Sequence, residues 1–435
     1  MYDRKCNFRF HFILINAIIL LLISACVPPT ITQPQPHKII EIPSVPTLAI
    51  ESLPVKSGLE VFLGSEQSAG PLKYGLLANQ TCVNRDLTHG VELLRKQLNL
   101  QLILSPEHGL YGAENAGDKV GDEADISSEI ESKTTYRKNP TEIAEMIEHL
   151  DVVLFDIQDI GIRSYTYIYS MAYLMQAAEI AGKKVIILDR PNPINGIQME
   201  GNILDSNFSS FVGLYPIPYR HGMTIGELAL LFNTEFEINC DLEVIKMEGW
   251  KRDMLFEETG LPWVPTSPHV PAARTILPMI STGTYGELGM LSEGVGTTSP
   301  FEYSGGPWIT NPQEFADTLQ ARMGNEVIFR PTFFKPYYGR HKGEICGGVQ
   351  IHVTDPDRYS AYLAGLQIMS AHMELYPDVD LFKNKNRWDM FAKVMGSDTI
   401  QKDLQIGKNP VEIQQLWLPD LEEFRLLREK YLLYN

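Results

Sequence analysis

Short apolar runs that end in polar clusters are the most regular pattern in this chain. Four of them, residues 73–78, 100–104, 151–155 and 184–188, have the length of buried strands, and stretches with helical spacing lie among them. Strands that are apolar throughout are typical of a parallel sheet with helices on both faces. The pattern therefore predicts an α/β fold.

Residues that are typical of helix N-termini indicate where helices begin between these strands. Pro140 lies where a proline is tolerated, in the first turn of a helix. Thr224 and Glu227 form a capping-box pattern at the start of another helix. Helical spacing also covers residues 164–181, and residues 242–246 predict one more strand.

The second half of the body has a different pattern. Residues 262–307 are rich in glycine and proline and are predicted to be irregular, and long irregular segments in a compact domain are usually functional loops. A helix at 312–323 and strands at 326–330 and 347–353 then alternate with further helices. We expect a smaller α+β domain at residues 287–435.

The N-terminus is predicted to be an export signal. Basic residues, among them Arg4 and Arg9, precede a short apolar run at residues 12–23, which small residues and Cys26 follow. The run is too short for a stable membrane span. Its end fits a bacterial lipobox in which Cys26 is lipidated and becomes the mature N-terminus. Ordinary signal-peptidase cleavage, with Cys26 incidental, is the alternative.

The segments that follow suggest where the protein works. Residues 26–57 contain many prolines and little pattern, which predicts an extended tether. With residues 1–25 as the signal, the folded body would consist of residues 58–286 and 287–435. We expect a periplasmic or cell-envelope protein that is attached to the membrane through its N-terminal lipid only.

Charge and motif content narrow the possible partners. The net charge is −17, and no run of lysine and arginine lies outside the signal, so nucleic acid is not expected to bind. Cys82, Cys240 and Cys346 are far apart and predict neither a disulfide framework nor a zinc site. Gly-rich nucleotide-binding loops, a serine nucleophile elbow and HExxH spacing are all missing from the sequence. We therefore predict no cofactor and no metal.

The polar clusters after the predicted strands form the candidate active site. In such sheets ligands bind beyond the carboxyl ends of the strands, so these clusters should converge. In chain order they contain Asn79, Gln80, Glu107, His108, Asp156, Gln158, Asp159, Arg163, Arg190 and Asn192.

Carboxylic acids stand out among these residues. Glu107 follows a strand and a proline, and partial shielding from water would suit it to act as a general acid. A second carboxylate, from Asp156 or Asp159, would complete the pair that cleaves a glycosidic bond. The alternatives are that Glu107 caps a helix and that the aspartates form salt bridges with Arg163 or Arg190.

The other polar side chains are candidate substrate ligands. The amides of Asn79 and Gln80 suit sugar hydroxyls or an acetamido group, and Arg190 suits a carboxylate. Further binding candidates come from the later loops: His221, Ser267, His269 and Glu293.

Taken together, these motifs resemble those of the NamZ-type exo-β-N-acetylmuramidases of bacteria, long catalogued as a domain of unknown function. The matching segments lie in the same order over roughly residues 60–435 and include Ser105-Pro106-Glu107-His108-Gly109, Phe155-Asp156-Ile157-Gln158-Asp159, Asp189-Arg190-Pro191-Asn192-Pro193 and His221-Gly222-Met223-Thr224. The resemblance implies a Rossmann-like domain joined to a smaller C-terminal domain, with the cleft between them. It also implies release of N-acetylmuramic acid from the non-reducing ends of peptidoglycan fragments, without a cofactor.

Three positions depart from the family pattern. Val295 stands where the family usually has arginine, a cation suited to the substrate's lactyl carboxylate. His269 stands in a loop that usually reads Ser-Pro-Asn-Met-Pro, and Cys82 replaces a common glycine. The first two lie in expected binding loops, so substrate preference and activity are open. A sugar-binding lipoprotein without turnover is the alternative function, and a deacylase or metallohydrolase is a third.

Overall fold

The computed structural model describes residues 54–65, 71–114 and 130–435. The predicted signal, Cys26 and nearly all of the tether lie outside the described residues. Residues Ser52–Asn435 form one unit. In the described ranges no helix is both long and apolar enough to cross a membrane.

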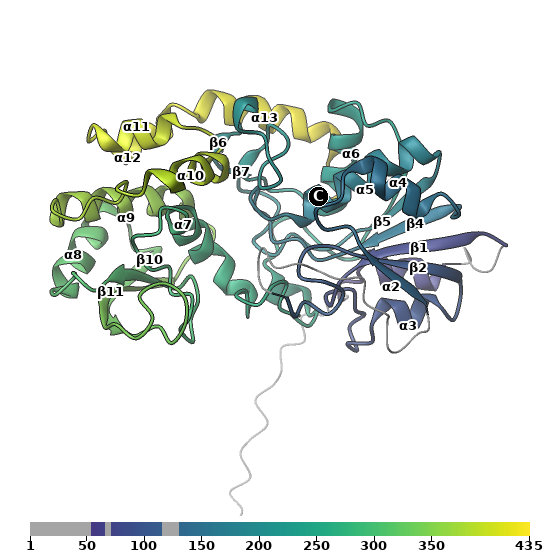
Figure 1. Ribbon diagram of the computed structural model, residues 1–435, viewed down its shortest axis with the longest axis horizontal. Coiled ribbons are helices and arrows are strands. Elements are labelled where there is room, and N and C mark those ends of the chain that lie inside the picture. The colour runs from purple at the N-terminus through teal and green to yellow at the C-terminus, as the bar shows by residue number, and fades with distance from the viewer. Residues whose placement is uncertain (1–53, 66–70, 115–129) are drawn as a thin grey trace, which may run out of the picture. The chain divides into compact units, whose positions relative to one another are not determined.

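A six-stranded parallel sheet confirms the predicted fold class (Figure 1). Its strand order is β3-β2-β1-β4-β5-β8, and every neighbouring pair is parallel. The strands are β1 (Lys73–Ala78), β2 (Asn99–Ser105), β3 (Glu131–Thr134), β4 (Val152–Asp156), β5 (Lys184–Leu188) and β8 (Asp241–Ile245). All of them except β3, a short edge strand with polar residues, were predicted from the sequence.

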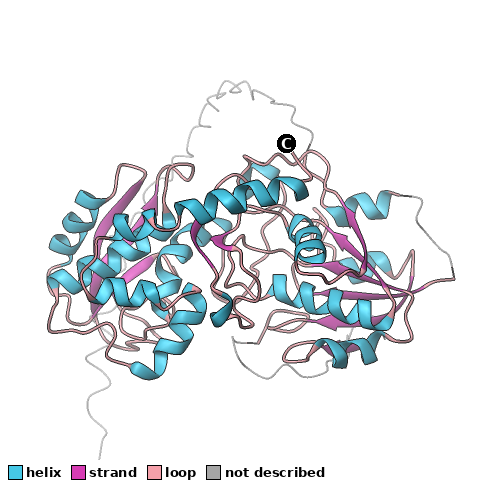
Figure 2. Ribbon diagram, turned by 90° about the horizontal axis from the view of Figure 1, so that it is seen from above, coloured by secondary structure: helices cyan, strands magenta, loops and turns pink. Residues whose placement is uncertain are grey.

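Helices cover both faces of this sheet (Figure 2). On β4, Val153 and Phe155 belong to one apolar cluster, whereas Val152 and Leu154 belong to another, because successive side chains point to opposite faces. The first cluster includes α4 (Pro140–Ile147), α5 (Tyr167–Ala181) and α6 (Ile225–Glu235). The second includes α2 (Gly58–Gly64) and α3 (Gly90–Leu94).

The predicted helix signals form as expected. Asn139 and Glu142 make a capping box before α4, and Thr224 and Glu227 make one before α6. Helix α5 ends at Gly182, which has the left-handed φ of 64° that favours glycine.

A second, antiparallel sheet with the strand order β10-β11-β9 lies in the C-terminal half. Its strands are β9 (Tyr303–Gly306), β10 (Val327–Phe334) and β11 (Cys346–Val353), and its helices are α7 (Ile276–Gly286), α8 (Pro312–Arg322) and α9 (Ala361–Leu375). Between β5 and β8 in sequence, β6 (Glu200–Ile203) and β7 (Pro218–Arg220) pair with each other. Four more helices follow: α10 (Trp388–Met395), α11 (Thr399–Gln405), α12 (Pro410–Gln415) and α13 (Leu418–Arg428).

One expectation needs correction. Residues 262–307 were predicted to be irregular, but α7 and β9 lie within them. Pro278 is in the first turn of α7, where its missing N–H costs no helical hydrogen bond. Tertiary packing then stabilises this glycine-containing helix, since Ile276 and Ile280 are fully buried.

The end of the chain returns to the parallel sheet. Arg428 in α13 donates to the carbonyl oxygens of Gly222, at 2.7 Å, and Ile197, at 2.8 Å. The Tyr434 hydroxyl donates to Asp189, directly after β5, at 2.5 Å. Burial raises the pKa of Asp189 to about 7, so the tail stabilises a carboxyl that lies out of water.

Two glycines at opposite ends of α2 provide a matched test of this packing. A Cβ on Gly58 would lie 2.6 Å from the Ile245 carbonyl oxygen, whereas one on Gly64 would meet nothing within 4 Å. We predict that Gly58→Ala lowers the free energy of unfolding by about 3 kcal/mol, because backbone atoms must move. Gly64→Ala should leave it unchanged or raise it by up to about 1 kcal/mol. Urea unfolding measures both, and equal effects would contradict the prediction.

Candidate active site

A cavity of about 270 Å³ lies beyond the carboxyl end of β2. The turn after β2, the segment that leads into α5, the 267–269 loop, α7 and α10 all contribute side chains. Its polar lining residues are Glu107, His108, Ser164, Tyr165, Thr166, Tyr167, Tyr219, Ser267, His269 and Glu287, and its apolar ones include Val212, Met279, Phe301, Met390 and Val394. Four of the residues predicted for the site therefore share one cavity: Glu107, His108, Ser267 and His269.

Glu107 is a half-buried carboxylate held by two hydroxyl groups. The Tyr136 hydroxyl donates to one of its oxygens at 3.0 Å, and the Thr166 hydroxyl donates to the other at 2.9 Å. Hydrogen bonds donated to a carboxylate stabilise its charged form. This arrangement suits a carboxylate that acts as base, nucleophile or stabiliser of positive charge.

Two imidazoles lie beside Glu107. His108 has a positive φ of 70°, and its Nδ1 is 2.7 Å from the Glu114 carbonyl oxygen. A carbonyl only accepts, so Nδ1 carries a hydrogen and the neutral ring has its acceptor at Nε2. Burial, and then the neighbouring His108, lower the pKa of His269, which is therefore neutral at pH 7. The His269 ring stacks on Tyr338 at a centroid distance of 5.7 Å.

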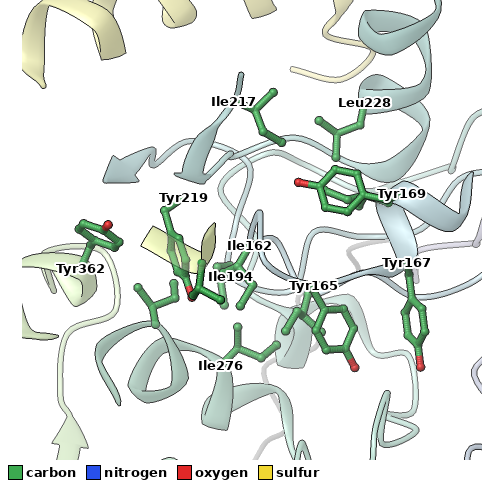
Figure 3. Close-up of a cluster of buried hydrophobic side chains, with 14 of the residues drawn as sticks. Ile162, Tyr165, Tyr167, Tyr169, Ile194, Ile217, Tyr219, Leu228, Ile276 and Tyr362 are labelled. Atoms are coloured by element: carbon green, nitrogen blue, oxygen red, sulfur yellow. The ribbon is translucent and has the colours of Figure 1, made fainter. Parts of the chain in front are cut away.

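Two tyrosines fix the loop that carries His269. Tyr165 and Tyr167 meet edge to face at 4.9 Å, and their hydroxyls point the same way (Figure 3). The Tyr165 hydroxyl donates to the Thr266 side chain at 2.8 Å, and the Tyr167 hydroxyl donates to the Thr266 carbonyl at 2.7 Å. Gln80, predicted as a ligand, donates to the same carbonyl at 3.1 Å. Gln80 thus positions this loop and does not line the cavity.

Asp156 and Arg190 form a buried ion pair. Asp156 has no exposed surface. Nη2 of Arg190 donates both to Asp156, at 2.8 Å, and to the Val83 carbonyl, at 3.0 Å, and Nε of Arg190 donates to the other Asp156 oxygen. Neither side chain lines the cavity. In this structure the two side chains form the salt bridge that was the alternative for Asp156, and Arg190 also lines a separate small pocket with Gln158. The catalytic role of Asp156 and the ligand-binding role of Arg190 stay predictions.

The carboxylate of Asp159 also has partners inside the protein and does not line the cavity. It accepts a hydrogen bond from the Gly161 N–H at 2.7 Å, and one of its oxygens lies 3.3 Å from Nε2 of the fully buried His221. Both residues are outside the cavity lining. In this structure Asp159 and His221 pair with each other outside the cavity lining, and the roles predicted for them, catalysis and substrate binding, stay predictions.

Arg163 has a purely internal role. Its guanidinium is fully buried and donates to the carbonyl oxygens of Asn202, Ile217 and Met395 at 2.7–2.8 Å. These bonds join β6, the segment before β7 and the end of α10. Because no nitrogen of Arg163 reaches the surface, the structure excludes substrate contact in this conformation.

Three predicted amide ligands are buried within turns. Asn79 accepts from the Thr81 N–H at 2.9 Å. Gln158 donates to the Pro191 carbonyl at 2.7 Å, and Asn192 donates to the Met223 carbonyl at 2.9 Å. These amides hold the strand-end turns together because buried polar groups need partners.

Glu293 lies near the cavity without lining it. Its carboxylate pairs with Arg340 at 2.5 Å, and Arg340 also donates to the Gly286 carbonyl at 2.6 Å. Arg340 belongs to the β10–β11 connection, which sequence analysis did not single out. The structure makes Glu293 a brace for this connection.

Sequence analysis also missed four lining or supporting residues. Tyr136 and Thr166 hold Glu107, Tyr219 forms part of the wall, and Glu287 adds a second carboxyl. None of these four was among the candidate site residues of the sequence analysis. Glu287 follows α7, in a segment that the sequence did not predict to be helical. Over the described part of the chain, no group of three or more His, Cys, Asp or Glu side chains is arranged to hold a metal ion.

Comparisons with known proteins agree with the motif pattern. Family models described as exo-β-N-acetylmuramidase NamZ, N-terminal and C-terminal, match residues 74–274 and 280–434. The peptidoglycan β-N-acetylmuramidase NamZ of Bacillus subtilis strain 168 is 40% identical over 384 residues, which are 87% of this chain and 91% of that protein.

Two solved structures of DUF1343 family proteins from Bacteroides fragilis NCTC 9343 share the fold. One has a TM-score of 0.80 and 37% identity, and the other has a TM-score of 0.70 and 28% identity. Each comparison covers 88% of this chain and 99% of the solved one.

The ion pair of Asp156 provides the test of a structural assignment. We predict that Asp156→Asn lowers the free energy of unfolding by about 3–5 kcal/mol, because it leaves the buried Arg190 without its anion. The amide of asparagine has the same shape and can still accept a hydrogen bond from Arg190, so molecules that remain folded keep the geometry of the turns, and their turnover should stay within a few fold of wild type. Asp253→Asn, an exposed change, serves as the control. Loss of turnover with unchanged unfolding in urea would contradict this assignment and restore Asp156 to the reaction.

Proposed function

The chain belongs to the NamZ family of exo-β-N-acetylmuramidases, and we propose that it releases N-acetylmuramic acid from the non-reducing ends of peptidoglycan fragments, in the cavity that holds Glu107. The observation that carries the proposal is the position of Glu107. It is a carboxylate that two hydroxyls orient at the wall of the cavity, in a chain that matches this family over most of its length.

The size and lining of the cavity support an exo mode. About 270 Å³ is at the small end for ligand pockets, which suits one sugar residue better than a chain. Apolar side chains such as Met279 and Phe301 suit the methyl groups of the acetamido and lactyl substituents. His108, Ser267 and His269 provide polar contacts for sugar oxygens.

Glu107 is assigned the anomeric side of the reaction. The sequence suggested that Glu107 is the acid, but in the structure both of its oxygens accept a hydrogen bond from a hydroxyl group, an arrangement that suits an acceptor or a nucleophile. A carboxylate there can accept a proton from attacking water, attack C1 itself, or stabilise the acetamido group as that group attacks. All three need the charge that Tyr136 and Thr166 help to hold.

Replacing Glu107 tests the proposed site. We predict that Glu107→Gln lowers kcat/KM for a muramyl disaccharide by roughly 10²–10⁴-fold, because the amide can neither accept a proton nor attack. Mass spectrometry of the released N-acetylmuramic acid measures the effect. Glu257→Gln, an exposed change outside this cavity, is the matched control and should keep wild-type activity.

Two results would oppose the proposal. Full activity of the Glu107→Gln protein would remove Glu107 from the reaction. A wild-type protein that binds the disaccharide and leaves it intact would favour the alternative of a sugar-binding lipoprotein.

We also propose that the protein is a lipoprotein of the cell envelope. The support is the sequence alone: a basic head, a short apolar run and Ile23-Ser24-Ala25-Cys26, followed by a proline-rich tether. A lipid on Cys26 would place the enzyme where peptidoglycan fragments are present.

Labelling with a fatty acid tests the lipid anchor. We predict that wild-type protein, expressed in a bacterium with alkyne-palmitate, carries the label and sediments with membranes. Cys26→Ser should lose both, because the serine cannot form the thioether, whereas Cys6→Ser should keep both. Label on the Cys26→Ser protein would overturn the proposal.

A further inference from the structure

We propose that Glu287 is the general acid of this site and protonates the leaving glycosidic oxygen, while Glu107 acts as the carboxylate at the anomeric side. This inference rests on the proposed function and adds the second carboxyl that a glycosidase needs.

The two carboxyls come from different parts of the chain into one small cavity. Glu107 lies in the turn after β2, and Glu287 directly follows the last residue of α7. Both line the same space of about 270 Å³. Hydrolysis of a glycosidic bond commonly uses a pair of carboxyls that flank the bond. Within the described ranges, the cavity lining contains no other carboxyl.

The hydrogen-bonding environments of the two carboxyls differ. Each oxygen of Glu107 accepts a hydrogen bond, one from Tyr136 and the other from Thr166, and donors of this kind stabilise a carboxylate in general. The Glu287 side chain forms no hydrogen bond or ion pair with any other residue that the structure describes. A carboxyl without donors has no such stabilisation of its anion, so the neutral form is favoured there in comparison.

Burial, rather than the surrounding charges, is what favours the neutral form of Glu287. Burial raises the pKa of Glu287, and the negative charge of Glu293 raises it further, whereas Arg387 and Arg340 lower it. The net pKa is above the ordinary value. Arg340 is committed to Glu293, and the Arg387 guanidinium lies against Gly289, two residues after Glu287. Carboxyls whose environments separate their proton affinities are the usual sign of acid and base roles.

The two aspartates near the site and the lining residue Tyr219 are poor candidates for the acid role. Asp156 is bound to Arg190, and Asp159 lies beside His221 behind the wall. Tyr219 lines the cavity, but burial raises the pKa of its hydroxyl to about 12, so it is a weak acid at neutral pH.

The chemical step balances with these two groups and one water. As the bond between C1 and the glycosidic oxygen breaks, its electron pair goes to that oxygen, which takes the proton of Glu287. The shortened fragment leaves as an alcohol. Water supplies the hydroxyl that ends on C1. Its remaining proton ends on Glu287, either directly or by way of Glu107, and this restores the starting protonation of both carboxyls.

Two substrates with different leaving groups test the assignment. Glu287→Gln should lower kcat/KM for the muramyl disaccharide by roughly 10²–10³-fold, because the sugar alkoxide needs a proton to leave. For 4-nitrophenyl N-acetylmuramide, kcat/KM should fall by less than about tenfold, because nitrophenolate leaves unprotonated. Glu107→Gln should lower both rates strongly, and Glu257→Gln should lower neither.

The outcomes separate this inference from the proposed function. Equal losses on the two substrates, or no loss on the disaccharide, would overturn the role of Glu287 while wild-type activity stands. A wild-type protein that cleaves neither substrate would instead overturn the proposed function.

A pH profile decides the matter even if Glu287→Gln does not fold. The acid must be protonated, so kcat/KM for the disaccharide falls as the pH rises through the pKa of Glu287. Arg387→Gln removes a cation that lowers this pKa, and the fall should therefore move to higher pH. The nitrophenyl substrate should show no such alkaline fall in either protein. An unmoved or acid-shifted fall in the Arg387→Gln protein would overturn the assignment.

Discussion

The buried ion pair between Asp156 and Arg190 is the interaction on which the geometry of the site depends. It ties the carboxyl end of β4 to that of β5, and Arg190 also holds the Val83 carbonyl after β1. The turn that leaves β4 then runs on to Ser164–Tyr167, which forms one wall of the cavity. A buried pair stabilises little in net terms, but each partner alone would be a costly buried charge. The pair therefore fixes which way these turns leave the sheet.

The sequence predicted much of the fold because its strands are buried on both faces and so apolar throughout. It predicted α4 and α6 because their capping boxes are local, three residues apart. The sequence did not predict β3, which is short and polar. It also did not predict α7, because the glycines of this helix are typical of a loop and its burial comes from packing on α9. Contacts with segments far away in the sequence stabilise β3 and α7, and a local sequence pattern carries no information about such contacts.

The site was only partly predictable for a related reason. A strand end tells which edge of the sheet a side chain occupies, and this placed Glu107 and His108 correctly beside the cavity. It does not tell which polar groups at that edge satisfy one another. Asp156 and Asp159 are taken up by Arg190 and His221. Glu287 reaches the cavity from the C-terminal half, so no strand-end argument points to it.

The departure at Val295 changes where positive charge lies around the cavity. Gly339 lies close to Val295, because a Cβ on this glycine would be 3.8 Å from the Val295 side chain. The next residue, Arg340, pairs with Glu293 and with two carbonyls. Its charge is thus used to hold the β10–β11 connection against the Glu293 loop. Arg387, which acts on Glu287, makes no ion pair in the described part of the chain. An anionic substituent of the substrate that approached Arg387 would weaken the pull of this cation on Glu287. Substrate binding would then favour the proton that the reaction requires.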